Sequence, residues 1–192
     1  MKTVKESQVI MHELILPNDT NLLGNVLGGR VMHLMDICAA MSAYKHARRP
    51  VVTASVDHLD FVAPAKKGDI LILRSSVNYT HKTSMEVGVK IEAETPLTGD
   101  VRHTATAYLT FVALDEQRKP TKIPEICPVT NKEKLILKYL VPQPQINLIN
   151  LIKSRFTLFN FIFDVETHKK WEKAYEIIGV NPYSISNHFG KA

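Results

Sequence analysis

Hydrophobic and polar positions alternate along much of the main part of the chain. The alternation is clearest between residues 85 and 94, where every second side chain is apolar (Met85, Val87, Val89, Ile91 and Ala93). A period of two puts the two sets of side chains on opposite faces of a strand, with the apolar set toward the core. Residues 101 to 114 alternate in the same way, and residues 51 to 61 and 69 to 80 also have the composition of strands. The short connections between these segments predict hairpins in an antiparallel sheet.

Residues 28 to 47 have helical spacing instead. Apolar residues occupy nearly all sides of this segment, and the most regular series is Val31, Leu34, Met35, Cys38 and Met41. A helix without a clear polar face is predicted to be wrapped by the rest of its domain. Residues 7 to 16 have the pattern of a strand that ends before Pro17. Together these elements predict an α+β fold in which a curled antiparallel sheet wraps one long central helix.

Prolines mark the end of this pattern. Residues 115 to 130 contain three prolines and are predicted to leave the domain across its surface. A short helix over residues 132 to 140 and two amphipathic helices are predicted to follow, the latter from helical spacing of apolar residues (Ile149, Ile152, Phe156, Phe159 and Phe163, then Trp171, Tyr175 and Ile178). We therefore divide the chain into a main domain, residues 1–128, and a basic helical extension, residues 129–192. We expect the extension to pack on the domain or on a neighbouring subunit, rather than to lie on a membrane surface.

Composition places the chain among globular proteins and limits its expected partners. Of the 192 residues, 45% are hydrophobic and 22% are charged, and the formal net charge is +5. Most of this excess lies in the extension, so the main domain is not expected to bind nucleic acid. No stretch has the pattern of a signal peptide or of a membrane-spanning helix. The two cysteines form neither a disulfide framework nor a metal-binding pattern, and we expect a cytoplasmic location.

The most distinctive chemistry lies in residues 21 to 36, where a glycine-rich loop leads into the predicted helix. Free N–H groups at a helix start stabilise an anion or a developing oxyanion, so Gly28 and Gly29 are candidate donors. Asp36 lies two turns further on the same face, roughly 10 Å along the helix axis from Gly29. Hydrogen-bond donors and a carboxylate in this arrangement suggest hydrolysis of a carbonyl compound.

Three groups of residues resemble a known family. The first is Asn21-x-x-Gly24-x-x-x-Gly28-Gly29 followed by Met35-Asp36, the second is residues 52 to 57, and the third is residues 82 to 86. In combination they resemble the hotdog-fold acyl-CoA thioesterases, in the branch of the bacterial YciA-type enzymes and the animal brain and cytosolic acyl-CoA hydrolases. The resemblance covers roughly residues 7 to 125, and it implies the same fold that the hydrophobic pattern predicts.

The resemblance also implies an activity, an assembly and a set of site residues. It implies an enzyme of fatty acid metabolism that hydrolyses acyl-CoA to a carboxylic acid and coenzyme A, without a cofactor or a metal. Two hotdog units are implied to join their sheets into a dimer, and three dimers commonly form a hexamer. Asp36 is implied to be the general base or nucleophile. Asn21 of the other chain is implied to act across the dimer interface, where it could orient the water or hold the carbonyl. The residues implied to line the coenzyme A site are Ala54, Ser55, Val56, Thr83, Ser84 and Met85.

Two aspects of the substrate stay open at this point. Arginine or lysine side chains should meet the phosphates of coenzyme A, and the candidates are Arg48, Lys66, Lys82 and Arg102. The length of the acyl chain is not indicated by the sequence, because side chains from two subunits would shape the tunnel.

Three other interpretations deserve comparison with hydrolysis. The sequence of the glycine loop is close to the motif of a phosphate-binding loop. Arg30 and Val31, however, replace the lysine and the hydroxyl residue of that motif, which argues against a nucleotide site. A hotdog module that senses acyl-CoA without cleaving it, with a tail that binds a partner or nucleic acid, would not need both Asn21 and Asp36. A hydratase would need a histidine–acid pair, and only His58 with Asp60 offers one. In a strand these two residues share a face and Asp57 points away, so we expect a structural pair there.

Overall fold

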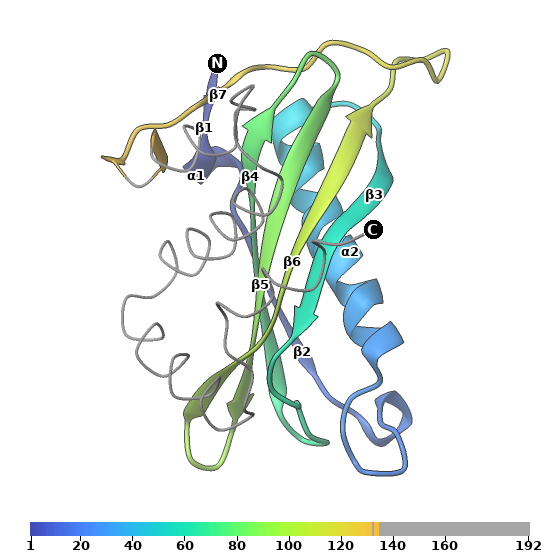
Figure 1. Cartoon of the computed structure of the whole chain (residues 1–192), viewed down its shortest axis with the longest axis vertical. Helices are drawn as coiled ribbons and strands as arrows, with labels where there is room; N and C mark the ends of the chain where they lie inside the picture. Colours follow the sequence, from blue (N-terminus) through green and yellow to red (C-terminus); the bar gives the residue numbers. More distant parts are fainter. Residues whose placement is uncertain (132, 135–192) are drawn as a thin grey trace, which may run out of the picture.

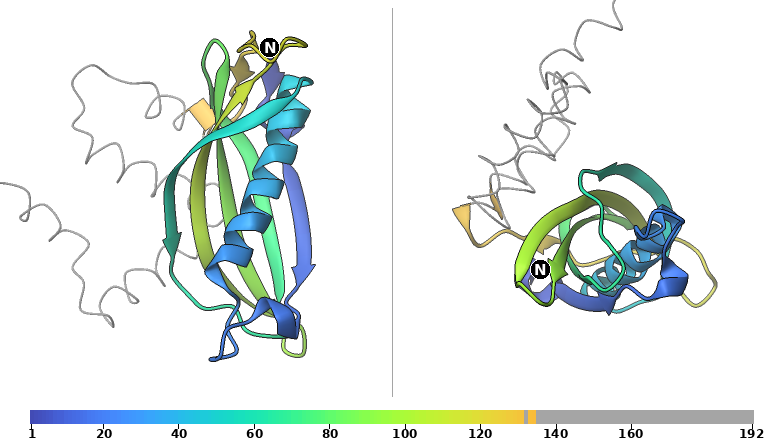
Figure 2. Two further views of the ribbon diagram at one scale, coloured as in Figure 1. Left: turned by 90° about the vertical axis from the view of Figure 1, so that its right-hand side faces the viewer. Right: turned by 90° about the horizontal axis from the view of Figure 1, so that it is seen from below.

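A computed structural model describes residues 1–131, 133 and 134, and the predicted helices of the extension lie almost wholly outside these residues. A five-stranded antiparallel sheet in the order β2-β4-β5-β6-β3 curls around one long helix, α2 (Figures 1 and 2). The helix spans Gly28–Ala47, and the strands are β2 (Val9–Leu14), β3 (Val51–Phe61), β4 (Ile70–Thr80), β5 (Ser84–Thr95) and β6 (Asp100–Ala113). The predicted α+β fold is confirmed, and each of these elements begins and ends within two residues of its predicted bounds.

The core lies between α2 and the concave face of the sheet. The alternating residues of β5 that were expected inside are all almost completely buried, and they belong to one cluster with Val31, Met35 and Cys38 of the helix. Small residues along the same face, such as Ala39 and Ala43, let the helix approach the sheet closely. Burial of this apolar surface is the main source of stability for the arrangement.

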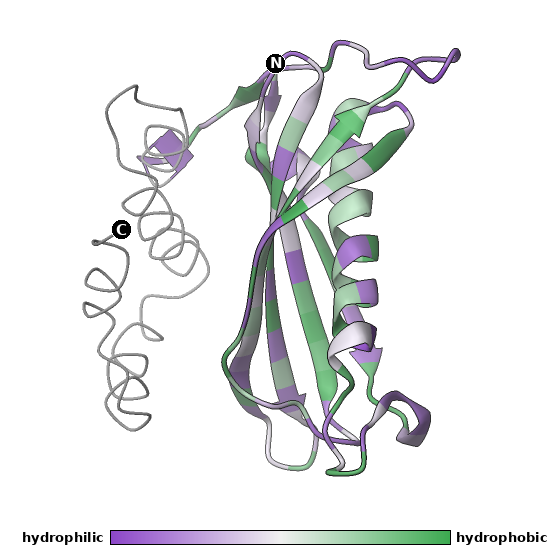
Figure 3. Cartoon of the chain, turned by 45° about the vertical axis from the view of Figure 1, so that its right-hand side comes forward, coloured by the Kyte–Doolittle hydropathy of each residue, from purple (hydrophilic) through white to green (hydrophobic). Residues whose placement is uncertain are grey.

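The prediction that the chain itself wraps α2 on all sides is wrong. Part of the helix is covered by the sheet, but one flank carries half-exposed apolar side chains, namely Ile37, Met41 and Tyr44, and Met32 is also half-exposed near the helix start. The neighbouring edge strand β3 also exposes apolar side chains, with Val52 46%, Val56 45% and Phe61 51% accessible. Hydrophobic positions can be followed along α2 and β3 in Figure 3. The five strands of one chain therefore do not reach around the whole helix, and β3 is left as an edge of the sheet.

No sequence pattern predicts the first two elements, β1 (Lys2–Thr3) and α1 (Val4–Ser7), which are too short to show a period. β1 pairs in parallel with β7 (Ile126–Cys127), so the start of the chain lies beside the end of the main domain. The Lys2 ammonium donates to the carbonyl oxygens of Lys45, at 3.3 Å, and His46, at 2.7 Å. A positive charge there stabilises the carboxyl end of α2.

The proline-rich stretch after β6 runs across one end of the sheet, as predicted (Figure 1). Backbone hydrogen bonds hold it to the loops at that end, from Leu114 N to Pro50 O at 2.8 Å and from Ile123 N to Lys82 O at 3.2 Å. In the part of the chain that the structure describes, no helix is both long and apolar enough to cross a membrane.

Candidate active site

The start of α2 presents unused backbone donors. The cap residue Leu27 makes no side-chain hydrogen bond to the helix, and the first N–H group bonded back to it belongs to Arg30, at 2.9 Å. Among the described residues, the N–H groups of Gly28 and Gly29 have no recorded acceptor. Space for an approaching group is open, since a Cβ atom built on Gly29 would meet nothing within 4 Å. The N–H groups of the two candidate glycines therefore lie at an accessible helix start.

The loop before the helix is held by Asn21. Its Oδ1 atom accepts hydrogen bonds from the N–H groups of Leu23, at 3.0 Å, and Asn25, at 3.2 Å. Two N–H donors fix which end of the amide is the oxygen, so Nδ2 is the end that remains for a further contact. Gly24 has a φ of +75°, a conformation that glycine adopts without strain. The local chemistry is that of an Asx turn, which the sequence alone indicates.

Arg30 fixes this loop to the sheet. Its Nη2 atom lies 2.6 Å from Oε1 of Glu13 on β2, and its Nε atom lies 3.0 Å from Oδ1 of Asp19. Asp19 ends the short 3₁₀ helix η1 (Pro17–Asp19), whose backbone also accepts a hydrogen bond from Leu27 N. Arg30 is thus engaged in holding the glycine loop, which agrees with the rejection of a nucleotide-binding loop.

Asp36 lies on the flank of α2 that faces β3. It is only partly buried, rather than enclosed, and its Oδ1 atom accepts a hydrogen bond of 2.7 Å from the Thr53 hydroxyl. Thr53 is exposed on β3 and is a functional candidate that sequence reasoning missed. A threonine in a predicted strand looks like an ordinary strand former, and only the pairing of β3 with α2 in space reveals its contact. One carboxylate oxygen is therefore oriented, and the other is left for a reacting group.

The two predicted catalytic residues do not meet within one chain. Gly28 and Asp36 are separated by about 12 Å along the helix axis, and Asn21 lies in the loop beyond the helix start. Both ends of this arrangement nevertheless border β3. Phe61 at one end of the strand comes within 3.7 Å of the Cβ position at Gly28, and Thr53 near the other end binds Asp36. The two groups of candidate residues thus border opposite ends of the same edge strand.

The residues expected to line a coenzyme A site occupy both sides of β6. In the pairing of the strands, Ser55 lies opposite Thr110, Val56 opposite Leu109, and Ser84 opposite Val112. Ala54 lies at an irregularity between Thr53 and Ser55, and the Thr83 carbonyl accepts a hydrogen bond of 2.9 Å from Ala113 N. The two segments therefore lie at the same end of the sheet, one strand apart. The Met85 side chain is 1% exposed and faces the core, so only its backbone is available to a ligand.

One of the four basic candidates has a structural role instead. The Arg102 guanidinium donates to Pro64 O and to Thr95 Oγ1, both at 3.0 Å, and forms an ion pair with the buried carboxylate of Asp69. These contacts bind three chain segments at the end of the sheet, so Arg102 has a structural role there. Its candidacy as a coenzyme A ligand stays a prediction, and it is the candidate whose guanidinium is already engaged within the fold.

His58 and Asp60 form the expected pair, with Nε2 and Oδ2 2.7 Å apart. Asp57 points to the other side, as predicted, and accepts hydrogen bonds from Ser55 at 2.5 Å and from Thr110 at 2.6 Å. The pair therefore joins two residues of one strand, as expected for a structural role. Among the described residues there is also no group of three or more potential metal ligands.

The buried thiol of Cys38 belongs to the core rather than to the site. Its Sγ atom lies 3.2 Å from the Ser75 hydroxyl, which in turn lies 2.6 Å from that of Ser42. Burial raises the pKa of the Cys38 thiol, and the hydrogen bond from Ser75 opposes this effect only in part. A neutral, enclosed thiol is a poor nucleophile.

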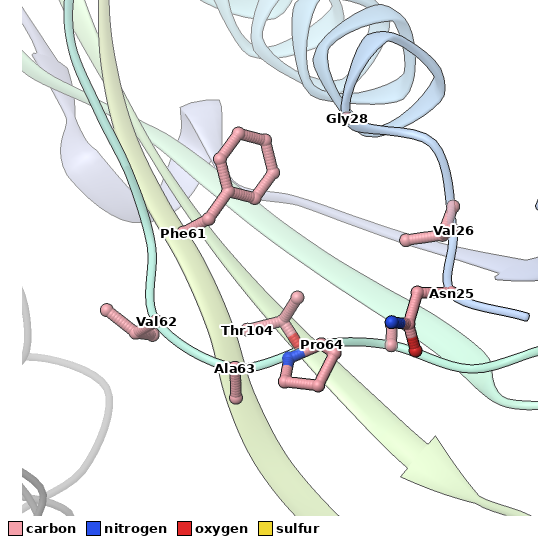
Figure 4. Close-up of a pocket in the computed structure, with 9 residues that line it drawn as sticks. Asn25, Val26, Gly28, Phe61, Val62, Ala63, Pro64 and Thr104 are labelled. Carbon is pink, nitrogen blue, oxygen red and sulfur yellow. The ribbon is translucent and has the colours of Figure 1, made fainter. Parts of the chain in front are cut away.

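A pocket of about 360 Å³ opens beside the helix start (Figure 4). It lies between the glycine loop, represented by Asn25 and Val26, and the segment that follows β3. In Figure 4 the Phe61 ring points toward the start of α2 at Gly28. The pocket therefore adjoins the free N–H groups of the helix start.

A profile of the thioesterase superfamily matches residues 23–99. A Bacillus subtilis protein named as an uncharacterized acyl-CoA thioester hydrolase, YkhA, is 41% identical over 132 residues, which are 69% of this chain and 77% of that protein. A structure described as an apo-hexameric acyl-CoA thioesterase has 38% identity and a TM-score of 0.70, covering 82% of this chain and 97% of the other. An acyl-CoA hydrolase from Staphylococcus aureus, solved with butyryl coenzyme A and coenzyme A, has 33% identity and a TM-score of 0.68, covering 90% and 97%.

Three further structures of the Staphylococcus aureus hydrolase each replace one residue by alanine: an asparagine, an aspartate and a threonine. The sequence intervals between these positions are the same as those between Asn21, Asp36 and Thr53 in this chain.

Proposed function

We propose that this chain cleaves acyl-CoA with Asp36 as the catalytic carboxylate. The chain belongs to the thioesterase superfamily, and its relatives are acyl-CoA hydrolases. The observation that carries this proposal is the 2.7 Å hydrogen bond between Asp36 and Thr53, at a position open to a second chain. The products are a free carboxylic acid and coenzyme A, and coenzyme A enters as part of the substrate.

Asp36 acts as a general base in the mechanism that we favour. With Oδ1 held by Thr53, the other oxygen takes a proton from a water molecule as the water oxygen adds to the thioester carbonyl carbon. The carbonyl oxygen becomes an oxyanion, which the N–H groups of Gly28 and Gly29 stabilise. When the tetrahedral intermediate collapses, the carbon–sulfur bond breaks, and the departing thiolate accepts from Asp36 the proton that the carboxylate took from water. Direct attack by the carboxylate, followed by hydrolysis of the anhydride, would use the same contacts.

Asn21 is a donor in this scheme. The hydrogen bonds from Leu23 and Asn25 occupy its Oδ1 atom, so the side chain presents Nδ2 to the substrate. An N–H group in this position would hold the thioester carbonyl, rather than accept a hydrogen bond from the attacking water. The contacts in the loop therefore favour a role for Asn21 in holding the carbonyl.

The site is proposed to need two chains. Antiparallel pairing of β3 with its copy around Asp57 would bring Thr53 and Asp36 of one chain beside the partner's Phe61 and helix start. Such pairing would also cover the exposed apolar strip of β3 and α2. The resulting dimer would have two equivalent sites, as expected for an isologous contact. We extend the proposal to a hexamer made of three such dimers.

Coenzyme A is proposed to lie across the end of the sheet near Ala54, Ser55 and Val56, with the turn at Thr83 and Ser84 on the far side of β6. Arg48 and Lys82 belong to the loops at that end and are the phosphate ligands that we favour, while Lys66 lies at the opposite end of β4. We propose that residues 1–128 form the catalytic domain and work without a cofactor or a metal. The two free cysteines fit a reducing, cytoplasmic location.

The proposal is tested with the purified full-length chain and a series of acyl-CoA esters, using release of free thiol as the measurement. Asp36→Asn keeps the shape of the side chain and removes the base, so we expect a loss of about a hundredfold or more in kcat. Thr53→Val removes the hydroxyl that orients Asp36 and should lower kcat by about tenfold with a folded protein. The matched control is Glu116→Gln, an exposed carboxylate in the loop after β6, which should not change the rate.

Near-normal turnover by Asp36→Asn would overturn its assignment. Tight binding of acyl-CoA by the natural chain without any thiol release would favour the sensor interpretation over hydrolysis.

A further inference from the structure

The convex face of the sheet, which points away from α2, is polar and yet largely buried. The residues of β5 that alternate with its core positions point to this face, and Lys90 among them is only 1% exposed. Thr106, opposite Lys90 on β6, is 1% exposed, and Ser76, on the neighbouring strand β4, is 2% exposed. An antiparallel sheet commonly leaves one face in water. Burial of these polar side chains therefore indicates a further layer over the convex face.

The side chains of this face are arranged as in a protein interior. The Lys90 Nζ atom lies 2.8 Å from Oε1 of Glu92, and the other oxygen of Glu92 lies 3.2 Å from Nε of Arg74. Lysine is almost never fully buried unless it is paired in this way. Ile72 and Tyr108 add apolar surface to the same face and are 5% and 2% exposed. The face thus combines paired charges with apolar groups that another element can pack against.

The described helices do not supply this layer. The helix α2 packs on the concave face, and α1 lies beside β4, where the Ser7 hydroxyl accepts a hydrogen bond of 3.0 Å from Val77 N. Both views in Figure 2 show the convex side of the sheet without a helix or strand over it, as far as the described residues go.

The described part of the chain ends beside this face. The strand β7 lies at the end of β4, where Ile126 N donates a hydrogen bond of 3.0 Å to the Thr80 hydroxyl. Residues 128–134, which follow β7, lead to the side of the sheet away from α2 (Figure 2). The chain therefore continues from the convex side.

We propose that residues 135–192 of the same chain cover the convex face of the sheet. Their length is sufficient, because β4 has 11 residues and is therefore roughly 36 Å long. A helix of about 24 residues has the same length. The 58 residues of this segment are enough for the two amphipathic helices expected from the sequence, laid along the strands.

The segment also matches the face in charge. Residues 135–192 contain seven lysines or arginines and four aspartates or glutamates. On the convex side of β3, β4 and β5, acids outnumber bases: the acids are Asp57, Asp60, Glu86, Glu92 and Glu94, and the bases are Arg74 and Lys90. Opposite net charges favour this contact. The apolar stripe that includes Phe156 and Phe159 would meet Ile72 and Tyr108, with the basic residues toward the acids around them.

The proposal separates two surfaces of the main domain by their chemistry. The apolar strip of β3 and α2 is left for a second copy of the chain, and the polar convex face is assigned to the chain's own extension. It does not depend on acyl-CoA hydrolysis, so its test needs no measurement of activity.

The first test is carbodiimide cross-linking of the natural full-length chain, which joins carboxylates to lysines in direct contact. Asp60, whose side chain is 44% exposed, is a suitable reactive group on this face. We expect links between the acids of the convex face and lysines of residues 135–192, in a band with the mass of one chain. The same links found only in a band of twice that mass would assign the face to a second copy and overturn the proposal. Absence of such links, when other links form, would also overturn it.

The second test measures how fast a maleimide labels a thiol placed on the convex face. Ser76→Cys is close in size to the natural residue, and Cys127→Ser leaves only the buried Cys38 as background. Ile10→Cys is the control, since Ile10 lies on the same side of the sheet at the β2 edge and is 57% exposed. We expect Ser76→Cys to be labelled at least tenfold more slowly than Ile10→Cys.

Substitutions in the extension then identify the cover. Phe156→Asp with Phe159→Asp places two charges in the predicted apolar stripe, and should raise the labelling rate of Ser76→Cys at least tenfold. Ser154→Asp with Thr157→Asp adds the same charges away from the stripe and should leave the rate unchanged. Equal rates in the two double variants would show that the extension does not cover this face. If the first double variant failed to fold, as judged by circular dichroism, the cross-links of the natural chain would decide.

Discussion

Single residues in this fold differ sharply in how far the sequence reveals their role. Asn21 and Asp36 can be named from their motif, and the contacts of Asn21 then decide which end of its amide is free. Thr53 cannot be named, because its hydroxyl matters only through Asp36, which is 17 residues away in the chain. Arg102 illustrates the reverse case, in which a candidate phosphate ligand has partners within the fold that the sequence does not indicate.

His103 on β6 gives a prediction at the same scale. Its Nε2 atom lies 2.9 Å from Ala105 O and 2.8 Å from the Thr106 hydroxyl, and burial lowers the pKa of the ring to about 4. Between this value and the ordinary value of 6.5, the unfolded chain binds a proton that the folded chain does not. Its contribution to stability is therefore complete above about pH 6.5 and declines as the pH falls toward 4.

We expect the urea midpoint of the natural chain to fall between pH 7 and pH 5 because of this residue. His103→Gln removes the titrating ring and should flatten the change, although the variant starts from a lower stability. His12→Gln, at an exposed position on β2, is the control and should keep the natural pH dependence. An equally steep dependence in His103→Gln would show that other groups are responsible.

At the scale of elements, the strands follow from the hydrophobic pattern because their side chains alternate between core and outer face. The first two elements, β1 and α1, do not follow from the pattern. They depend on the pairing of β1 with β7 and on the contact of Lys2 with the end of α2. The prediction of an enclosed helix failed for a physical reason as well. A pattern shows that a flank of α2 is apolar, but not whether the same chain or a second one covers it.

The connection between β2 and α2 is an element whose stiffness should matter for turnover. Arg30→Met would remove both ion pairs of the glycine loop, with Glu13 and with Asp19. Because these groups are partly exposed, we expect a loss of only about 1 kcal/mol in the free energy of unfolding. Because the donors at Asn21 and at the helix start would then be held less firmly, kcat should fall by about tenfold.

Thermal unfolding and steady-state kinetics would separate the two effects. Arg30→Lys retains the positive charge but not the forked guanidinium, so its rate should lie between those of Arg30→Met and the natural chain. If Arg30→Met lost stability but kept its full kcat, the anchor would be structural and the proposed influence on the loop would be wrong.

At the scale of the whole molecule, the decisive feature is that the helix start and Asp36 border different ends of β3, which is why we propose that each chain supplies two different halves of a site. Sequence patterns predict the elements but cannot show that Gly28 and Asp36 face different ends of the same edge strand. That relationship emerges only when Phe61 is found beside Gly28 and Thr53 beside Asp36.

Complementation between two inactive variants tests this arrangement. Asp36→Asn and Asn21→Ala should each be nearly inactive alone. A mixed dimer of the two contains one site with both natural residues, so equimolar co-expression should restore about a quarter of the natural activity. Samples that are separately purified and mixed without subunit exchange are the control. Failure of co-expressed, mixed dimers to regain activity would show that both residues act within one chain.

The exposed edge of β3 also ties catalysis to the amount of protein. A chain separated from its partner would keep Asn21, Asp36 and Thr53 in place and still have no complete site. Specific activity would therefore decline on dilution below the dissociation constant of the dimer, while the fold of each chain persisted. Under those conditions the rate would grow with the square of protein concentration, so that halving expression would cut the rate about fourfold.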